Sequence, residues 1–291
     1  MEHIRVFIAL KGLSASQKWF MLAAVLLILF TVYTIILVSG VFTYFTLYQE
    51  QWLLHRPLNG LDCVFHEWKQ FGEIGDSLFF AFLLCLACLF LKYRYRVLPY
   101  LFLLLLIGVG IEYVGKQQIA QPVPEGLRVG LDNLYCPQIS DQSRSTKILI
   151  GLGLWWQAPL AHPGRIRKEQ YAANMPIVID EETPYTYSYP SGHAIRWCFL
   201  GLIACWLIWR HVRYRILRAL LMVVALVIAF GGGFTLFYIG LHLFTDLISG
   251  YLIGTALACS GIGLLAQDKG RRKSKKESEQ ADRPEADALV S

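Results

Sequence analysis

The chain has 291 residues, of which 55% are hydrophobic and 16% are charged, and its mean hydropathy is +0.45. A soluble protein of this length would carry about a quarter charged residues, so the composition excludes an ordinary soluble domain and indicates a polytopic membrane protein. The net charge of +6 does not indicate a nucleic-acid partner, because Lys and Arg lie in short segments beside apolar runs and form no separate basic domain.

The first half of the chain contains three predicted spans. Residues 1–18 form a mildly basic segment. The apolar run at about 19–47 is too long for the core of a signal peptide, so we interpret it as an uncleaved first span. Two more spans are predicted at about 77–91 and 98–114, joined by a short basic connector.

The second half begins with region 115–190, the longest stretch without a predicted span. Its apolar segment 148–160 is short for a span, and we expect it to be re-entrant or interfacial. Three spans follow at about 192–209, 219–238 and 241–265, with a basic connector at 210–218. The charge-rich tail 267–291 is predicted to be disordered.

The basic segments set the expected topology. With six spans, the N-terminus, both basic connectors and the tail lie on one side, which the positive-inside rule makes cytoplasmic. A seventh span at 148–160 would place the connector 210–218 outside and would separate Lys116 from His193 across the bilayer. We therefore expect an all-α, six-helix membrane domain at 19–266, in a plasma or inner membrane, with both termini cytoplasmic.

The seven cysteines give little indication of chemistry. Cys85 and Cys88 form a C-x-x-C inside an apolar run, where packing is a better explanation than redox chemistry. Cys63 and Cys136 fall in predicted loops on the same side, so a disulfide between them stays open. No cluster has the spacing of metal ligands, and we expect neither a metal nor another cofactor.

Polar residues collect where three predicted spans meet the non-cytoplasmic side. Ionisable groups at such places are costly and are therefore functional candidates. The three clusters are Glu112 with Lys116, Ser191 and Gly192 with His193, and His242 with Asp246.

Together these clusters favour phosphate chemistry. A carboxylate four residues after His242 can orient its imidazole, His193 can serve as an acid, and the N–H groups that open a helix can bind an anion. Each cluster also has a structural explanation, namely an ordinary helix start, a polar pair and a boundary lysine. Their shared side favours the functional interpretation.

These residues resemble the motifs of the type 2 phosphatidic acid phosphatase superfamily, which also includes vanadium haloperoxidases. The family's motifs read K-x6-R-P, P-S-G-H and S-R-x5-H-x3-D. The chain matches them with Lys116 and Pro124, with an intact segment 190–193, and with Thr235, His242 and Asp246. The likeness extends over about residues 70–266.

The resemblance implies an integral membrane phosphatase that acts on a lipid phosphate or diphosphate at the outer face. It implies that His242 attacks phosphorus to form a phospho-histidine, that Asp246 assists it, and that His193 protonates the leaving group. Lys116, Ser191 and Gly192 are then expected to hold the phosphate. The same scaffold would also suit a lipid phosphotransferase.

Two arginines of the family motifs are missing, because Val123 and Leu236 stand in their places. Since one oxyanion donor can be worth a hundredfold or more in rate, a catalytically weak or inactive lipid-phosphate binder or transporter-like protein is the alternative. Arg196, one helical turn after His193, is the predicted replacement. Further basic residues in the outer loop could also reach the site: Arg128, Arg165, Arg167 and Lys168.

Overall fold

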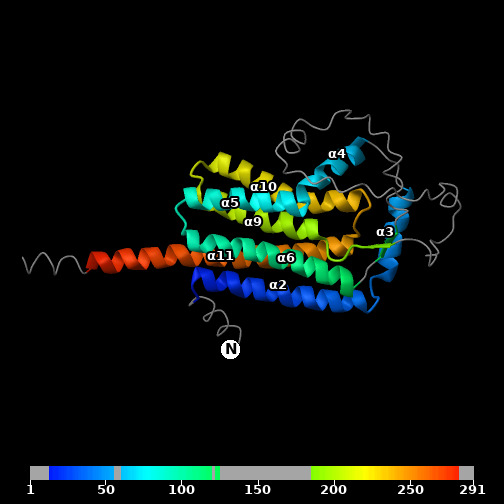
Figure 1. The fold of residues 1–291 in the computed structure, drawn as a ribbon, viewed down its shortest axis with the longest axis horizontal. Coiled ribbons are helices and arrows are strands. Elements are labelled where there is room, and N and C mark those ends of the chain that lie inside the picture. The colour runs from blue at the N-terminus through cyan, green and yellow to red at the C-terminus, as the bar shows by residue number, and fades with distance from the viewer. Residues whose placement is uncertain (1–12, 56–59, 120–121, 125–184, 282–291) are drawn as a thin grey trace, which may run out of the picture.

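The structure is a computed structural model, and it describes residues 13–55, 60–119, 122–124 and 185–281. The described chain forms an elongated bundle of helices (Figure 1). Five of them are long and apolar enough to cross a membrane: α2 (Ala15–Val38), α6 (Leu98–Gln118), α9 (Gly192–His211), α10 (Arg215–Tyr238) and α11 (Phe244–Ala281). The predicted span at 77–91 coincides with α5 (Ile74–Phe90), an apolar helix of 17 residues. The predicted all-α membrane bundle is confirmed.

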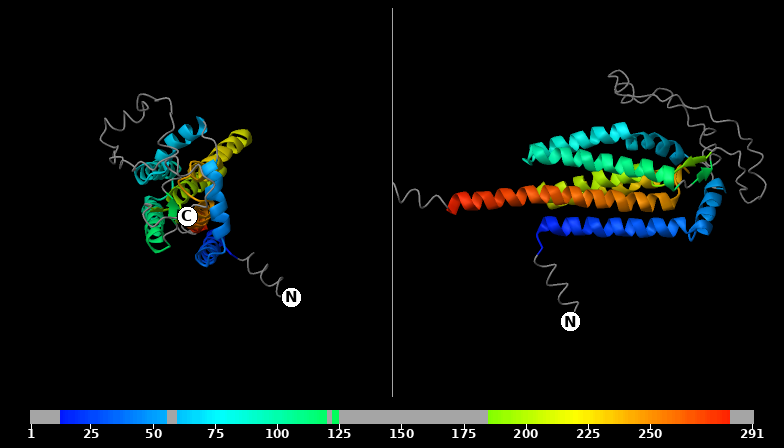
Figure 2. Two further views of the ribbon diagram at one scale, coloured as in Figure 1. Left: turned by 90° about the vertical axis from the view of Figure 1, so that its right-hand side faces the viewer. Right: turned by 60° about the horizontal axis from the view of Figure 1, so that its bottom comes forward.

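Shorter elements connect these helices. They are α3 (Thr43–His55), α4 (Gly60–Lys69), η1 (Gln70–Gly72), η2 (Tyr95–Val97), β1 (Pro122–Pro124) and β2 (Tyr185–Tyr187). The helix α3 lies across one end of the bundle, beside the antiparallel pair of β1 and β2 (Figures 1 and 2). This small sheet was not predicted, and it joins the end of α6 to the segment before α9.

The centre of the bundle is built by α9 and α11. Over the 18 most apolar consecutive residues of each helix, 56% of the residues in α9 and 67% of those in α11 are buried inside the protein, compared with 6% of those in α2. The helix α11 packs against both α2 and α9, and α9 also packs against α10. Cys85 and Cys88 are buried in the core cluster, which confirms that they are packing residues.

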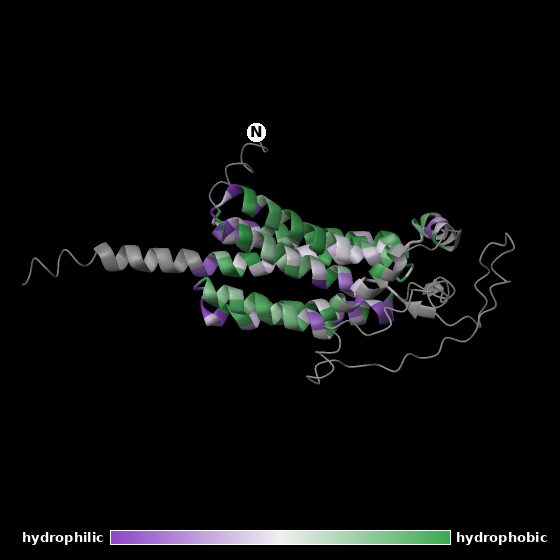
Figure 3. Ribbon diagram, turned by 90° about the horizontal axis from the view of Figure 1, so that it is seen from above, coloured by the Kyte–Doolittle hydropathy of each residue, from purple (hydrophilic) through white to green (hydrophobic). Residues whose placement is uncertain are grey.

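The helices of the bundle consist mostly of hydrophobic residues (Figure 3), and many of these residues are exposed on its outer surface. Ile28 and Ile35 on α2 are 63% and 64% exposed, and Val227 on α10 is 60% exposed. A contiguous apolar surface of this kind is not stable in water, and a lipid bilayer would cover it. The high hydrophobic content of the sequence therefore reflects apolar residues on the outside of the bundle as well as in its core.

The first predicted span does not form a single helix. The apolar run at 19–47 is divided, because α2 ends at Val38 and α3 begins only at Thr43. Gly40 lies between them with φ of 82°, a left-handed conformation that glycine adopts easily and that commonly ends helices. The apolar run therefore continues past the end of the helix that spans the bundle.

The end of the chain also differs from the prediction. The helix α11 continues to Ala281, through much of the segment 267–291 for which disorder was expected. Lys, Arg, Glu, Gln and Ala dominate this stretch, and all of them are good helix formers. Residues 282–291 lie outside the described part of the chain.

The two ends of the bundle differ in what they carry. The start of α2, the connector between α5 and α6, and the connector between α9 and α10 lie at one end (Figures 1 and 2). The starts of α9 and α11 and the end of α6 lie at the other, as the antiparallel chain path requires. The three predicted polar clusters therefore meet at one end of the bundle, away from the basic connectors.

Candidate active site

The start of α9 supplies the anion-binding part of the site. Ser191 is the N-cap of α9, and its hydroxyl accepts a hydrogen bond from the Ala194 N–H at 3.4 Å. Its own N–H donates to the Asp246 carbonyl at 3.1 Å, which fixes α9 to α11. Within the described residues, the N–H groups of Gly192 and His193 make no hydrogen bond, so they are available to an anion.

The two candidate histidines face each other. The ring centroids of His193 and His242 are 6.5 Å apart, although 49 positions separate them in the sequence (242 − 193). Both residues are largely buried, and His193 Nε2 and His242 Nδ1 have no hydrogen-bond partner within the described residues. Two buried imidazoles with unpaired nitrogens are costly for a fold, so they point to a function.

The orientation of His242 is set just before α11. The predicted last span at 241–265 begins slightly later than expected, at Phe244, which leaves His242 in the preceding turn. Asp246 Oδ2 accepts a hydrogen bond from the Leu243 N–H at 2.9 Å and lies 3.6 Å from His242 Nδ1. The carboxylate therefore caps the helix and directs the Nδ1 edge of the imidazole towards itself, so that Nε2 is the nitrogen left for chemistry.

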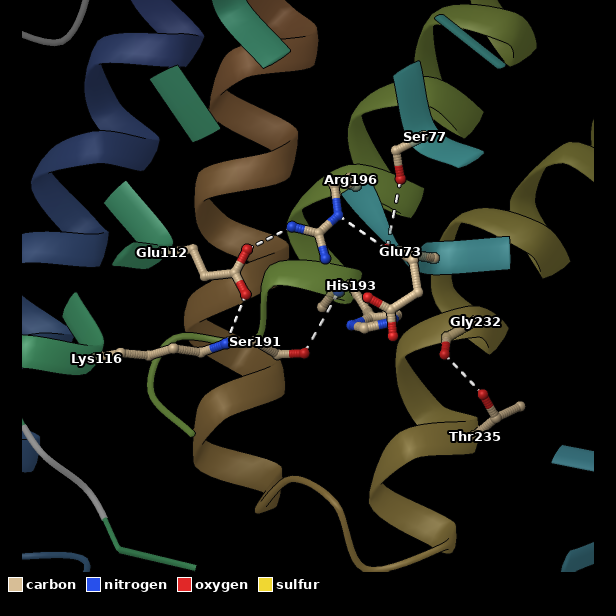
Figure 4. A network of polar contacts seen from close by, with 11 residues as sticks. Glu73, Ser77, Glu112, Lys116, Ser191, His193, Arg196, Gly232 and Thr235 are labelled. Carbon is tan, nitrogen blue, oxygen red and sulfur yellow. Dashed lines mark hydrogen bonds and ion pairs between the residues drawn. The ribbon is translucent and has the colours of Figure 1, made fainter. Parts of the chain in front are cut away.

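Both cations of the site hold one carboxylate. Lys116 Nζ on α6 donates to Glu112 Oε1 at 2.6 Å, and Arg196 Nη1 on α9 forms an ion pair with Glu112 Oε2. Figure 4 shows that each of the two side chains is directed at a different oxygen of the Glu112 carboxylate. Arg196 is 2% exposed, so its guanidinium lies in the interior of the bundle.

The segment before α5 covers this cluster. The Gly72 carbonyl accepts a 2.9 Å hydrogen bond from Arg196 Nε, and the Glu73 carboxylate lies 3.8 Å from His193 Nε2. A Cβ atom at Gly72 would lie 2.1 Å from His193 Cδ2, so only glycine allows this close approach. Sequence reasoning missed both residues, because nothing in the local pattern places this segment over α9.

The positions of the missing motif arginines hold no cation. Val123 belongs to β1, and Leu236 is a buried residue of α10 packed with Ile239 and Leu241. Thr235, beside it, donates to the Gly232 carbonyl at 2.7 Å. The outer-loop residues Arg128, Arg165, Arg167 and Lys168, the apolar segment 148–160 and Cys136 lie outside the described residues, so neither these candidates nor the Cys63–Cys136 pair is described.

Tyr189 closes the side of the site nearest α2. Its buried hydroxyl forms a 2.6 Å hydrogen bond with Thr34 Oγ1 on α2, and the Tyr189–Pro190 peptide bond is cis. Burial raises the pKa of the Tyr189 hydroxyl, so this group stays neutral near physiological pH. Tyr189 therefore anchors the motif segment without adding charge.

Two apolar grooves flank the polar cluster. The larger, of about 610 Å³, runs between α5, α9 and α10 and is lined by Phe71, Phe80, Trp197, Leu200 and Val224, among others. The smaller, of about 490 Å³, lies between α2 and α6 and reaches Tyr189 and Pro190. Among the described residues, no group of three or more His, Cys, Asp or Glu is arranged to hold a metal ion.

The chain is similar in part to one protein family and in fold to one solved structure. A family model described as the PAP2 superfamily matches residues 139–268, which include the segment 190–193, His242 and Asp246. A search of curated proteins found no significant match. The fold is similar to the crystal structure described as the first transmembrane PAP2 type phosphatidylglycerolphosphate phosphatase from Bacillus subtilis. That likeness has a TM-score of 0.54 and 14% sequence identity, and it covers 87% of this chain and 96% of that one.

Proposed function

We propose that the chain is an integral membrane phosphatase for lipid phosphates or diphosphates, because a PAP2 superfamily model matches residues 139–268 and the fold is similar to that of a PAP2 type phosphatase. It acts at the non-cytoplasmic face through a phospho-histidine intermediate. The observation that carries the proposal is the pair of facing, buried histidines, His193 and His242, at the open N-terminus of α9. A protein that only bound an anion would have no need of two such imidazoles.

The proposed reaction has two steps. In the first, the lone pair of His242 Nε2 attacks phosphorus, the bond from phosphorus to the leaving oxygen breaks, and His193 gives that oxygen a proton. In the second, water attacks phosphorus, the bond to His242 breaks, and His193 takes the proton of the water as phosphate forms. Asp246, 3.6 Å from His242 Nδ1, orients the nucleophile and stabilises its positive charge in the intermediate.

The remaining site residues bind the phosphate oxygens. Ser191 and Gly192 bring the start of α9 to the anion, and Lys116 and Arg196 supply positive charge that stabilises the transition state. The proposal needs no metal or other cofactor, since the nucleophile, the acid and the charges all come from side chains.

A lipid substrate fits the surroundings of the site. The larger groove begins beside Trp197, one turn after His193, and its lining is almost entirely apolar. An acyl or prenyl chain would lie in this groove while the headgroup reaches the histidines. Phosphatidate, phosphatidylglycerol phosphate and polyprenyl diphosphate all have this form.

The positive-inside rule supports the outer-face assignment. Lys92, Arg94 and Arg96 join α5 to α6 at the end of the bundle away from the site, and the residues between α9 and α10 add Arg213 there. Short basic connectors are retained on the cytoplasmic side. The site is then non-cytoplasmic, and the start of α2 and the end of α11 are cytoplasmic.

The test is phosphate release by the purified full chain in detergent, measured across the three lipid classes. His242→Ala is expected to reduce release more than 10³-fold, because it removes the nucleophile. His211→Ala, a histidine at the opposite end of the bundle, is the matched control and should retain release within about twofold. Rapid acid-free quenching with radiolabelled substrate should trap labelled protein only when His242 is present. Release that survived His242→Ala would contradict the mechanism.

One observation favours a second candidate, a weakly active or inactive lipid-phosphate binder. The motif arginines are absent, and Lys116 and Arg196 are both bound to Glu112. Lipid-phosphate binding without release from any substrate would favour this candidate. Transfer of the labelled phosphoryl group to an added alcohol in place of water would instead indicate a phosphotransferase.

A further inference from the structure

Glu112 has no role in the reaction described above, yet it lies at the centre of the site. Its residue is 9% exposed, and its carboxylate contacts both Lys116 and Arg196. A Cβ atom built on Gly192 would lie 1.8 to 2.1 Å from the carboxylate atoms, so the carboxylate packs directly on the first residue of α9. A helix start with free N–H groups and two cations is a site for an anion, and an internal carboxylate occupies part of it.

The charges show why this position matters. A phosphate that binds at Gly192 needs Lys116 and Arg196, but each already has a short contact with Glu112. Charge-assisted hydrogen bonds are about twice as strong as neutral ones, so the phosphate cannot gain both cations without weakening the contacts of Glu112. Phosphate and Glu112 therefore compete for the same two donors.

We propose that Glu112 is an internal anion that competes with phosphate for Lys116 and Arg196 and thereby limits how tightly the free phosphate product is held. The carboxylate returns to the two cations as phosphate leaves, so the buried guanidinium of Arg196 is never left without a counter-charge. Glu112 is thus a positioning residue that acts through the two cations. This inference rests on the proposed phosphate site.

Glu112→Gln tests the competition, because glutamine keeps the shape of the side chain and removes its charge. Equilibrium dialysis of the purified full chain with radiolabelled inorganic phosphate gives the affinity without turnover. The variant is expected to bind phosphate on the order of tenfold more tightly, since the cations no longer share a charged partner. Inhibition of lipid hydrolysis by inorganic phosphate should become stronger by the same factor.

Asp268→Asn is the matched control. Asp268 is also a buried carboxylate paired with an arginine, but that arginine, Arg94, lies in the connector between α5 and α6 at the other end of the bundle. Its substitution should leave phosphate affinity unchanged within about twofold.

The outcomes separate the inference from the function on which it rests. Tighter binding by Glu112→Gln supports the inference. Weaker or unchanged binding overturns it and assigns Glu112 a purely structural role, while the phosphatase proposal stands. If neither the unmodified chain nor the variant binds inorganic phosphate, the proposed phosphate site fails, and the inference fails with it.

A second variant covers the case in which Glu112→Gln does not fold. Glu112→Asp keeps the charge but withdraws it by one methylene group from Gly192, so its phosphate affinity should fall between those of the unmodified chain and of a chain without the charge. Thermal unfolding and gel filtration in detergent show which variants are folded. An aspartate variant that folds and binds phosphate no more tightly than the unmodified chain contradicts the competition.

Discussion

The two ends of the bundle contain similar residues but treat them differently. At the end with the basic connectors, Asp268 forms an ion pair with Arg94, in which Oδ1 lies 3.5 Å from Nε. Asp268 Oδ2 also accepts a hydrogen bond from the backbone N–H of Arg94 at 3.2 Å. His211 at the same end forms a 3.1 Å hydrogen bond with the Tyr93 hydroxyl. Histidine, arginine and carboxylate therefore form satisfied pairs there.

At the opposite end, histidine and aspartate side chains are also buried, but some of their nitrogen and oxygen atoms make no hydrogen bond. In the part of the chain that the structure describes, the buried side-chain atoms without a partner are His193 Nε2, His242 Nδ1 and Asp246 Oδ1, all at this end. Buried polar groups cost stability unless they are paired, so a fold retains unpaired ones chiefly where a ligand completes them. Unsatisfied polar atoms therefore indicate the site better than the mere presence of polar residues.

The largest difference between the two ends is expected at His193. His193→Gln should lower the turnover of an alkyl phosphate about 10³-fold, because glutamine cannot supply the proton to the leaving oxygen. His211→Gln, at the satisfied end, should change turnover less than twofold. Both are measured as phosphate release by the purified chain.

The leaving group provides the check on this prediction. An aryl phosphate leaves with little need of a proton, so its turnover should fall much less in His193→Gln. Equal losses on alkyl and aryl substrates would show that His193 has a structural role.

A smaller loss of kcat/KM is expected from a substitution at Gly192, which is in close contact with Glu112. Gly192→Ala would place a Cβ atom on the Glu112 carboxylate, so this carboxylate must shift, and Lys116 and Arg196, which contact it, lose their positions as phosphate donors. Since a displacement of about 1 Å can cost about 10²-fold, kcat/KM should fall by that order.

The matched control for Gly192→Ala is Gly110→Ala on α6. A Cβ atom at Gly110 meets nothing within 4 Å, and alanine is the better helix former. This variant should keep its activity and should unfold no more easily. Similar losses in the two variants would show that the effect of Gly192→Ala does not come from the contact with Glu112.

The smallest effect is expected at the satisfied end. Arg94→Ala removes an ion pair whose arginine side chain is 44% exposed, so the free energy of unfolding should fall by no more than about 1 kcal/mol. Phosphate release should stay within twofold, because this end takes no part in the chemistry. A large loss of activity in Arg94→Ala would show that the end with the basic connectors also contributes to the reaction.

Much of the fold follows from local sequence. The predicted spans at 192–209 and 219–238 match α9 and α10 closely, because long apolar runs must become helices in a bilayer. The division of the first run at Gly40 was missed, although a glycine after a serine is a recognised helix end. Hydropathy alone could not show it, since the apolar residues continue past the break.

The site could be predicted only in part. The residues that the structure brings together, Lys116, His193 and Arg196, were identified from motif spacing and from the helical turn. The spacing of Glu112 and Lys116 also indicated an i, i+4 pair. The contact of Glu112 with Arg196, and the cover provided by Gly72, depend on how distant helices pack, which no local pattern records.

The groove between α5, α9 and α10 has a consequence for kinetics. Its lining includes Leu83, Leu221 and Val224, which are 44%, 37% and 54% exposed on the surface that faces lipid, so the groove opens sideways into the bilayer. A long-chain substrate of the proposed phosphatase would then reach the groove by diffusion in two dimensions. The rate should follow the mole fraction of substrate in the membrane or mixed micelle, and adding inert detergent should slow hydrolysis even when the bulk substrate concentration is constant.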